Sequence, residues 1–138
     1  MKKWVSISIG FLLLTLSDPS HAAEQEELSA AKAAFHRYCA SCHGVEGKGN
    51  GPIATALKYP PTNLTELSKN NHGEFPRQRV YDVIDGRAEV RAHGPRDMPV
   101  WGEQLKPRDM PTGGGSMEGY ARGTMMMLTR YLESIQAK

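Results

Sequence analysis

Both cysteines of the chain fall in one five-residue run, Cys39-Ala40-Ser41-Cys42-His43, and this placement limits what the chain can fold into. Cysteines so close together cannot link distant segments, so the chain lacks the disulfide framework that supports many small secreted domains. A bond between the two would close almost no loop and would stabilise little. Something other than a disulfide framework must therefore use the two thiols.

The spacing Cys-x-x-Cys-His is typical of covalent haem attachment, because each residue in it has a separate task. Two thiols separated by two residues on one helical turn can each bond to one vinyl group of the porphyrin. The adjacent histidine then faces the iron from the same turn. We predict one covalently attached haem c with its iron, with Cys39 and Cys42 as thioethers and His43 as one axial ligand.

Two other uses of the motif fit the neighbouring sequence less well. A thioredoxin-like redox pair would need a strand before the motif within a βαβ pattern, whereas an alanine-rich helical segment precedes it. A zinc site would pair the cysteines with two of His36, His72 and His93, but these histidines lack the close spacing of a structural Cys2His2 site. Both alternatives are therefore disfavoured.

The first residues are typical of a secretory signal peptide. Two lysines precede an apolar run over 5–16, and Ser20-His21-Ala22 offers small residues at the usual cleavage positions. The run is shorter than the roughly 20 apolar residues that a membrane-spanning helix needs. We predict that 1–22 is a cleaved signal peptide and that 23–138 forms a single periplasmic domain without stable membrane insertion. An uncleaved N-terminal anchor is the alternative.

The charged side chains are almost balanced, with 17 Lys and Arg against 15 Asp and Glu. Nucleic acids and anionic membranes attract a concentrated basic surface, which this composition does not provide. We therefore expect no nucleic-acid partner. The expected partners are redox proteins, an electron donor and an acceptor, and the protein itself is expected to be a monomer.

Three segments show helical spacing of apolar residues, and none shows the alternation of a strand. They cover 26–42, 75–86 and 118–136, and the stretches between them are rich in glycine and proline, with short turns expected at 53–57 and 65–69. We predict an all-α fold with long loops, which a bound prosthetic group would keep ordered. The apolar stripes consist of Leu28, Ala31, Phe35 and Tyr38, of Val80, Val83 and Ile84, and of Met125, Leu128, Leu132 and Ile135.

Several motifs, taken in order along the chain, resemble those of the class I c-type cytochromes, and specifically of small bacterial monohaem members. The matches are Phe35, Cys39-x-x-Cys42-His43-Gly44, Gly51-Pro52, Met98-Pro99-Val100-Trp101-Gly102 and Leu128-x-x-Tyr131. The resemblance covers nearly all of the chain after the predicted signal peptide.

This resemblance implies the cytochrome c fold, in which the N-terminal and C-terminal helices cross and long loops wrap around one haem. Phe35, Leu128 and Tyr131 match the positions that pack at that crossing. It also implies that the carbonyl of Pro52 accepts the ring N–H of the axial histidine. Trp101 is expected to pack on the haem or to bond a propionate.

The second iron ligand is predicted to be a methionine, whose soft thioether favours ferrous iron and raises the reduction potential. Met98, Met110 and Met117 all lie in the long loop before the last helix. Met98 is favoured because a proline follows it and Trp101 lies close by, and the family resemblance points the same way. Met110 repeats the Arg-Asp-Met-Pro frame without apolar neighbours, and it is the alternative. The methionines at 125–127 are expected to pack within the last helix.

With His43 and Met98 both bound, the iron has no open position for a substrate. The sequence therefore predicts a soluble one-electron carrier that is not itself an enzyme and docks on partners through less than about 1,200 Å². One alternative is a cytochrome subunit of a larger periplasmic oxidase or dehydrogenase complex, with the loop over 105–116 as its contact surface. Another is a five-coordinate gas-binding or peroxidase-like haem protein.

Overall fold

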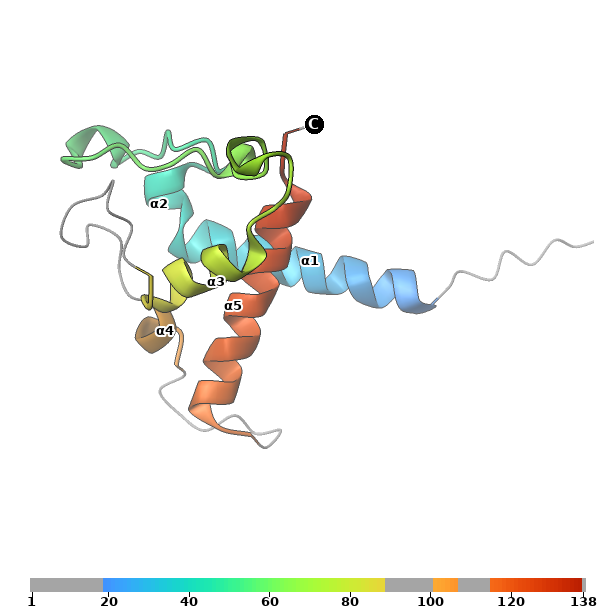
Figure 1. Ribbon diagram of the computed structural model, residues 1–138. Helices are drawn as coiled ribbons and strands as arrows, with labels where there is room; N and C mark the ends of the chain where they lie inside the picture. The colour runs from blue at the N-terminus through green and yellow to red at the C-terminus, as the bar shows by residue number, and fades with distance from the viewer. Residues whose placement is uncertain (1–18, 89–100, 107–114, 138) are drawn as a thin grey trace, which may run out of the picture.

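The structure is a computed structural model of the 138-residue chain, and it describes residues 19–88, 101–106 and 115–137. The described residues form helices and three short 3-10 turns joined by loops, and they contain no strand (Figure 1). The predicted all-α fold is confirmed. The helices are α1 (Pro19–Tyr38), α2 (Ala40–His43), α3 (Arg77–Asp85), α4 (Trp101–Gln104) and α5 (Met117–Ser134), and the 3-10 turns are Ala54–Ala56, Leu64–Glu66 and Lys69–Asn71.

The core lies where α1 and α5 cross (Figure 1). Ala31 and Phe35 of α1 are 0% and 1% exposed, and Leu128 and Tyr131 of α5 are also buried. The rings of Phe35 and Tyr131 lie with their centroids 5.3 Å apart, a normal distance for a tilted aromatic pair. The crossing of the first and last helices, with these residues at its centre, is therefore confirmed.

The N-terminal part of α1 contributes nothing to this core. Ser20 and every residue from there through Glu26 are exposed, and in Figure 1 this end of the helix projects away from the other helices. Buried or half-buried positions begin only at Glu27 and Leu28. None of the helices in the described part of the chain is long and apolar enough to cross a membrane.

The first helix ends earlier than predicted. The apolar spacing predicted one helix over 26–42, but α1 stops at Tyr38 and a separate short helix, α2, follows. The backbone leaves helical geometry at Cys39, where φ is −118°, although its N–H still donates to the Phe35 carbonyl at 2.8 Å. No glycine or proline marks this break in the sequence. The break turns α2 away from the line of α1.

The other two predicted helices agree with the structure to within a few residues. Gly86 ends α3 in the left-handed conformation that glycine adopts easily, with φ of 82°. The side chain of Ser116 begins α5 by accepting a hydrogen bond from the Gly119 N–H at 2.9 Å. The short helix α4 was not predicted, and it lies in a stretch expected to be loop.

Candidate haem site

The two cysteines lie on either side of the start of α2 and are both free, partly buried thiols. Burial raises the pKa of the Cys39 thiol to about 12, and the neighbouring Cys42 adds to the shift. Redox-active pairs of the thioredoxin type need the opposite, a lowered thiol pKa. No strand precedes the motif within residues 19–38 either. Both observations disagree with the thioredoxin-like alternative.

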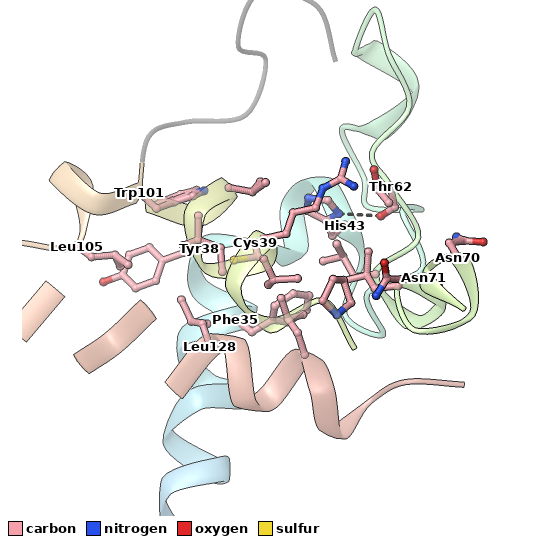
Figure 2. A pocket seen from close by; sticks show the side chains of 18 residues that line it. Phe35, Tyr38, Cys39, His43, Thr62, Asn70, Asn71, Trp101, Leu105 and Leu128 are labelled. Atoms are coloured by element: carbon pink, nitrogen blue, oxygen red, sulfur yellow. Dashed lines mark hydrogen bonds between the residues drawn. The ribbon is translucent and has the colours of Figure 1, made fainter. Parts of the chain in front are cut away.

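The imidazole of His43 is held by the backbone of a distant loop. Its Nδ1 lies 3.0 Å from the carbonyl oxygen of Thr62, to which it donates a hydrogen bond (Figure 2). A carbonyl partner fixes the proton on Nδ1 and leaves Nε2 with the lone pair that a metal ion binds. The ring is therefore oriented and in the tautomer that suits an axial iron ligand.

The carbonyl that holds His43 is not the one predicted. The family resemblance pointed to Pro52, but the structure pairs the imidazole with Thr62. The backbone around the exposed Pro52 binds the end of the motif helix instead, because the Gly51 N–H donates to the Cys42 carbonyl at 3.0 Å. Two successive prolines before Thr62 are the signal in the sequence, since they keep the chain extended and leave the next carbonyl outside any helix.

Cys39 and His43 line a mostly apolar pocket whose walls come from all five helices and the loop after α2 (Figure 2). Helix α3 supplies Val80, Val83 and Ile84, and α5 supplies Leu128 and Leu132. The loop residues Leu64 and Leu67 were not recognised from the sequence. The remaining lining residues are Phe35, Tyr38, Thr62, Asn70, Asn71, Pro76, Arg79, Trp101 and Leu105.

The two ends of this pocket differ in polarity. Thr62, Asn70 and Asn71 lie toward one end, and Tyr38, Trp101 and Leu105 lie toward the other (Figure 2). Such a division suits an amphipathic ligand with a large apolar ring and an acidic edge. Within the described residues, no Asp or Glu side chain lines the pocket, so an acidic group meets no like charge there.

Trp101 lies in the pocket wall, as its predicted contact with the haem requires. It is the first residue of α4, it is half-buried, and its ring centroid lies 5.7 Å from that of Tyr38. The glycine that follows allows this placement, because a Cβ on Gly102 would collide with the Asp85 side chain at the end of α3. Close packing of α4 on α3 thus brings the indole to the pocket.

Of the candidate methionine ligands, Met98 and Met110 lie outside the described residues. Met117 begins α5 and is not among the residues that line the pocket. The expected packing of the three adjacent methionines is correct for Met125, which is 4% exposed, and wrong for Met126, which is 56% exposed. Successive helical positions point in different directions, so three neighbours cannot all face the core.

The donor set and the pocket fit a covalently attached haem. Two free thiols and an imidazole whose Nδ1 is bonded to a carbonyl lie within one short segment, beside an apolar cavity with one polar end. The described residues contain no group of three or more His, Cys, Asp or Glu side chains that could hold a metal ion. Two thiols for covalent attachment and one imidazole for the metal match a haem, which brings its own iron and supplies most of that iron's coordination.

Comparison with known families gives the same identification. A family model described as "Cytochrome C oxidase, cbb3-type, subunit III" matches residues 26–111, which is more than half of the chain. No curated protein and no solved structure matches the chain. The matched region begins in α1 and includes the Cys-x-x-Cys-His motif, the loop that carries Thr62, α3 and α4. The chain therefore belongs to this cytochrome c family, and it transfers electrons through a covalently bound haem c.

Proposed function

We propose that the protein is an exported one-electron carrier in which Cys39 and Cys42 attach the haem and His43 and Met98 bind its iron. The observation that carries the proposal is the hydrogen bond from Nδ1 of His43 to the Thr62 carbonyl in the wall of the pocket. When bound, the haem supplies a metal centre that takes up and releases a single electron.

The residues of the chain would control that electron transfer in three ways. Thioether bonds from the two cysteines would fix the cofactor in one position, which limits its movement when its charge changes. The carbonyl of Thr62 would keep the His43 imidazole in one orientation and raise its basicity. Apolar walls such as Val80, Val83 and Leu128 would exclude water and favour the less charged, reduced state.

Met98 is the proposed second ligand because the chain reaches the pocket immediately after it. Trp101 follows Met98 by three residues, begins α4 and lines the pocket. Met110 lies further from the nearest described pocket residue on its N-terminal side, because it follows Leu105 of the pocket wall by five residues and Lys106 does not line the pocket. A thioether at this position would fill the coordination of the iron and leave no site for a substrate.

Replacing Met98 with alanine tests the ligand assignment. We expect Met98→Ala to lose the low-spin, methionine-ligated absorption and paramagnetic spectra and to bind carbon monoxide rapidly when reduced, because one axial position opens. Met110→Ala is the matched control, since it has the same sequence frame, and it should keep both properties of the wild type. Loss of methionine ligation in Met110→Ala alone would overturn the assignment. Rapid carbon monoxide binding by the wild type at neutral pH would instead favour the five-coordinate gas-binding or peroxidase-like alternative.

The charge of Arg79 is expected to raise the reduction potential. Arg79 is the only Lys or Arg among the described residues of the pocket wall, and no described carboxylate pairs with it. A positive charge near the iron disfavours the ferric state, so Arg79→Gln should have a lower midpoint potential, and the difference should shrink as salt is added.

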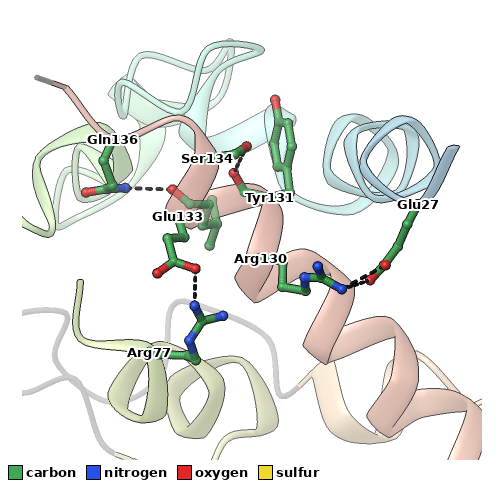
Figure 3. Close-up of polar contacts among 8 residues, drawn as sticks. Glu27, Arg77, Arg130, Tyr131, Glu133, Ser134 and Gln136 are labelled. Carbon is green, nitrogen blue, oxygen red and sulfur yellow. Dashed lines mark hydrogen bonds and ion pairs between the residues drawn. The ribbon is translucent and has the colours of Figure 1, made fainter. Parts of the chain in front are cut away.

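Arg77→Gln is the control for Arg79→Gln, because it removes the same charge from the same helix. Arg77 pairs with Glu133 of α5 and is not among the pocket residues (Figure 3). Its potential should stay close to that of the wild type. Equal shifts in the two variants would show that Arg79 acts only through the net charge of the protein.

A fixed subunit of a larger oxidase or dehydrogenase is the second candidate, and the description of the matched family favours it. For a free carrier we propose cleavage after Ala22, within the stretch from Ser20 through Glu26 whose residues are all exposed. Size-exclusion chromatography of a periplasmic extract separates the two candidates. A free carrier should elute with the mass of one chain of residues 23–138, whereas a subunit should elute with a large enzyme.

A further inference from the structure

The end of α5 is fastened to the loop that carries Thr62, through one side chain. Gln136 lies two residues after the last residue of α5, and both halves of its amide are used. Its Oε1 accepts a hydrogen bond from the Ser68 N–H at 2.8 Å, and its Nε2 donates to the Leu64 carbonyl at 2.7 Å. The same Nε2 donates to the Leu132 carbonyl at 2.7 Å, inside α5.

Neighbouring backbone bonds make this connection stiff. The Ala137 N–H donates to the Thr65 carbonyl at 2.7 Å, next to the Gln136 contact with Leu64. On its other side, Leu64 donates its own N–H to the Gly47 carbonyl at 2.7 Å, in the turn that follows α2. Leu64 is thus held between the end of α5 and the turn after the haem motif, two residues from Thr62.

We propose that Gln136 is a positioning residue that holds the Thr62 carbonyl on the His43 imidazole and thereby lowers the reduction potential of the haem. This inference rests on the proposed function, because it requires His43 to bind the iron. A short bond from Nδ1 to a carbonyl makes the imidazole a stronger donor, which favours ferric iron. If the loop loosens, the bond lengthens on average and the imidazole donates less.

The remote position of Gln136 gives the proposal a specific consequence. Gln136 is not among the residues of the pocket wall, and it is uncharged, so neither contact with the haem nor a change of charge can explain an effect on the potential. A hydrogen-bonded route from its amide to the iron ligand runs through the loop over 62–68. Its amide makes three hydrogen bonds to backbone groups, which a side chain without donors and acceptors cannot replace.

Gln136→Met tests the proposal, because methionine is close to glutamine in length and shape but makes none of the three hydrogen bonds. We expect a higher midpoint potential, so that more than half of the variant is reduced at the potential where half of the wild type is. We also expect faster solvent exchange of the His43 Nδ1 proton, followed by NMR in the reduced, haem-loaded protein. Gln136→Ala also removes the three hydrogen bonds and should show the same two changes. It serves as the second variant if the methionine packs poorly.

Ser134→Ala is the matched control. Its hydroxyl donates to the Tyr131 carbonyl at 2.7 Å, so the variant weakens the same turn of α5 without touching the loop (Figure 3). Its potential and proton exchange should match the wild type. An unchanged potential in both Gln136 variants, or an equal shift in Ser134→Ala, would overturn the positioning role.

His43→Ala distinguishes failure of this inference from failure of the proposed function. Loss of the low-spin spectrum in a variant that still carries covalent haem means that His43 is a ligand, and the Gln136 variants then decide the inference alone. If His43→Ala keeps the low-spin spectrum of the wild type, the proposed ligation fails and the positioning role fails with it.

Discussion

Replacing Phe35 with alanine should lower the free energy of unfolding by about 3–5 kcal/mol, the usual cost of truncating a buried phenylalanine. Phe35 is 1% exposed and is the largest side chain in the described residues to be buried so completely. It packs on Tyr131 at the crossing of α1 and α5 and also forms part of the haem pocket wall. Its loss would leave a cavity between α1 and α5, beside the haem pocket.

Thermal unfolding of the haem-loaded protein measures this effect. For a domain of this size, the expected loss corresponds to a midpoint about 10–20 °C below that of the wild type. His36→Ala is the control, because His36 is the next residue of α1 and is exposed. Its effect should stay within about 0.5 kcal/mol. A loss below about 1 kcal/mol for Phe35→Ala would mean that the crossing is not the main core.

Gly51→Ala is expected to disrupt the haem motif itself. A Cβ at this position would collide with the Ser41 carbonyl oxygen and lie 2.6 Å from the Cys42 carbonyl carbon. These obstacles are backbone atoms, so the clash cannot be relieved by rotating a side chain. Either the loop must leave α2, breaking the bond from the Gly51 N–H to the Cys42 carbonyl, or α2 must shift together with Cys42 and His43.

Two measurements follow this effect. Haem staining of the denatured protein on a gel should show much less covalent haem in Gly51→Ala, and the purified remainder should be destabilised by about 3 kcal/mol or more. Gly123→Ala is the control, since nothing lies within 4 Å of its added Cβ and the residue is an exposed part of α5. That variant should gain about 0.5–1 kcal/mol of stability. Wild-type haem content in Gly51→Ala would contradict the packing of this loop on α2.

The sequence predicted those elements whose conformation depends on residues close together in the chain. The stripe of Leu128, Leu132 and Ile135 predicts a helix because each residue repeats the same face, and Gly86 predicts an end because glycine adopts the left-handed conformation. The thiols and imidazole of the haem motif were recognisable because their spacing is fixed by the porphyrin. Each of these signals lies within a few residues of the structure that it predicts.

The features that sequence analysis missed depend on contacts between distant segments. The break at Cys39 has no glycine or proline to mark it, and it places α2 beside a loop that follows in the sequence. The carbonyl of Thr62 reaches His43 only because the loop folds back over α2. Helix α4 depends on the close approach of Gly102 to Asp85, which the sequence of that stretch alone does not reveal.

The crossing of α1 and α5 also sets an order of events when the protein is made. The haem motif is synthesised before the helix that supplies Leu128 and Leu132, so the pocket stays open on one side until the last residues have emerged. Before α5 docks, Cys39, which is partly buried in the folded chain, would be more accessible for attachment of the haem than it is afterwards. A haem attached before α5 docks would then be covered by Leu128 and Leu132 in the last step of folding.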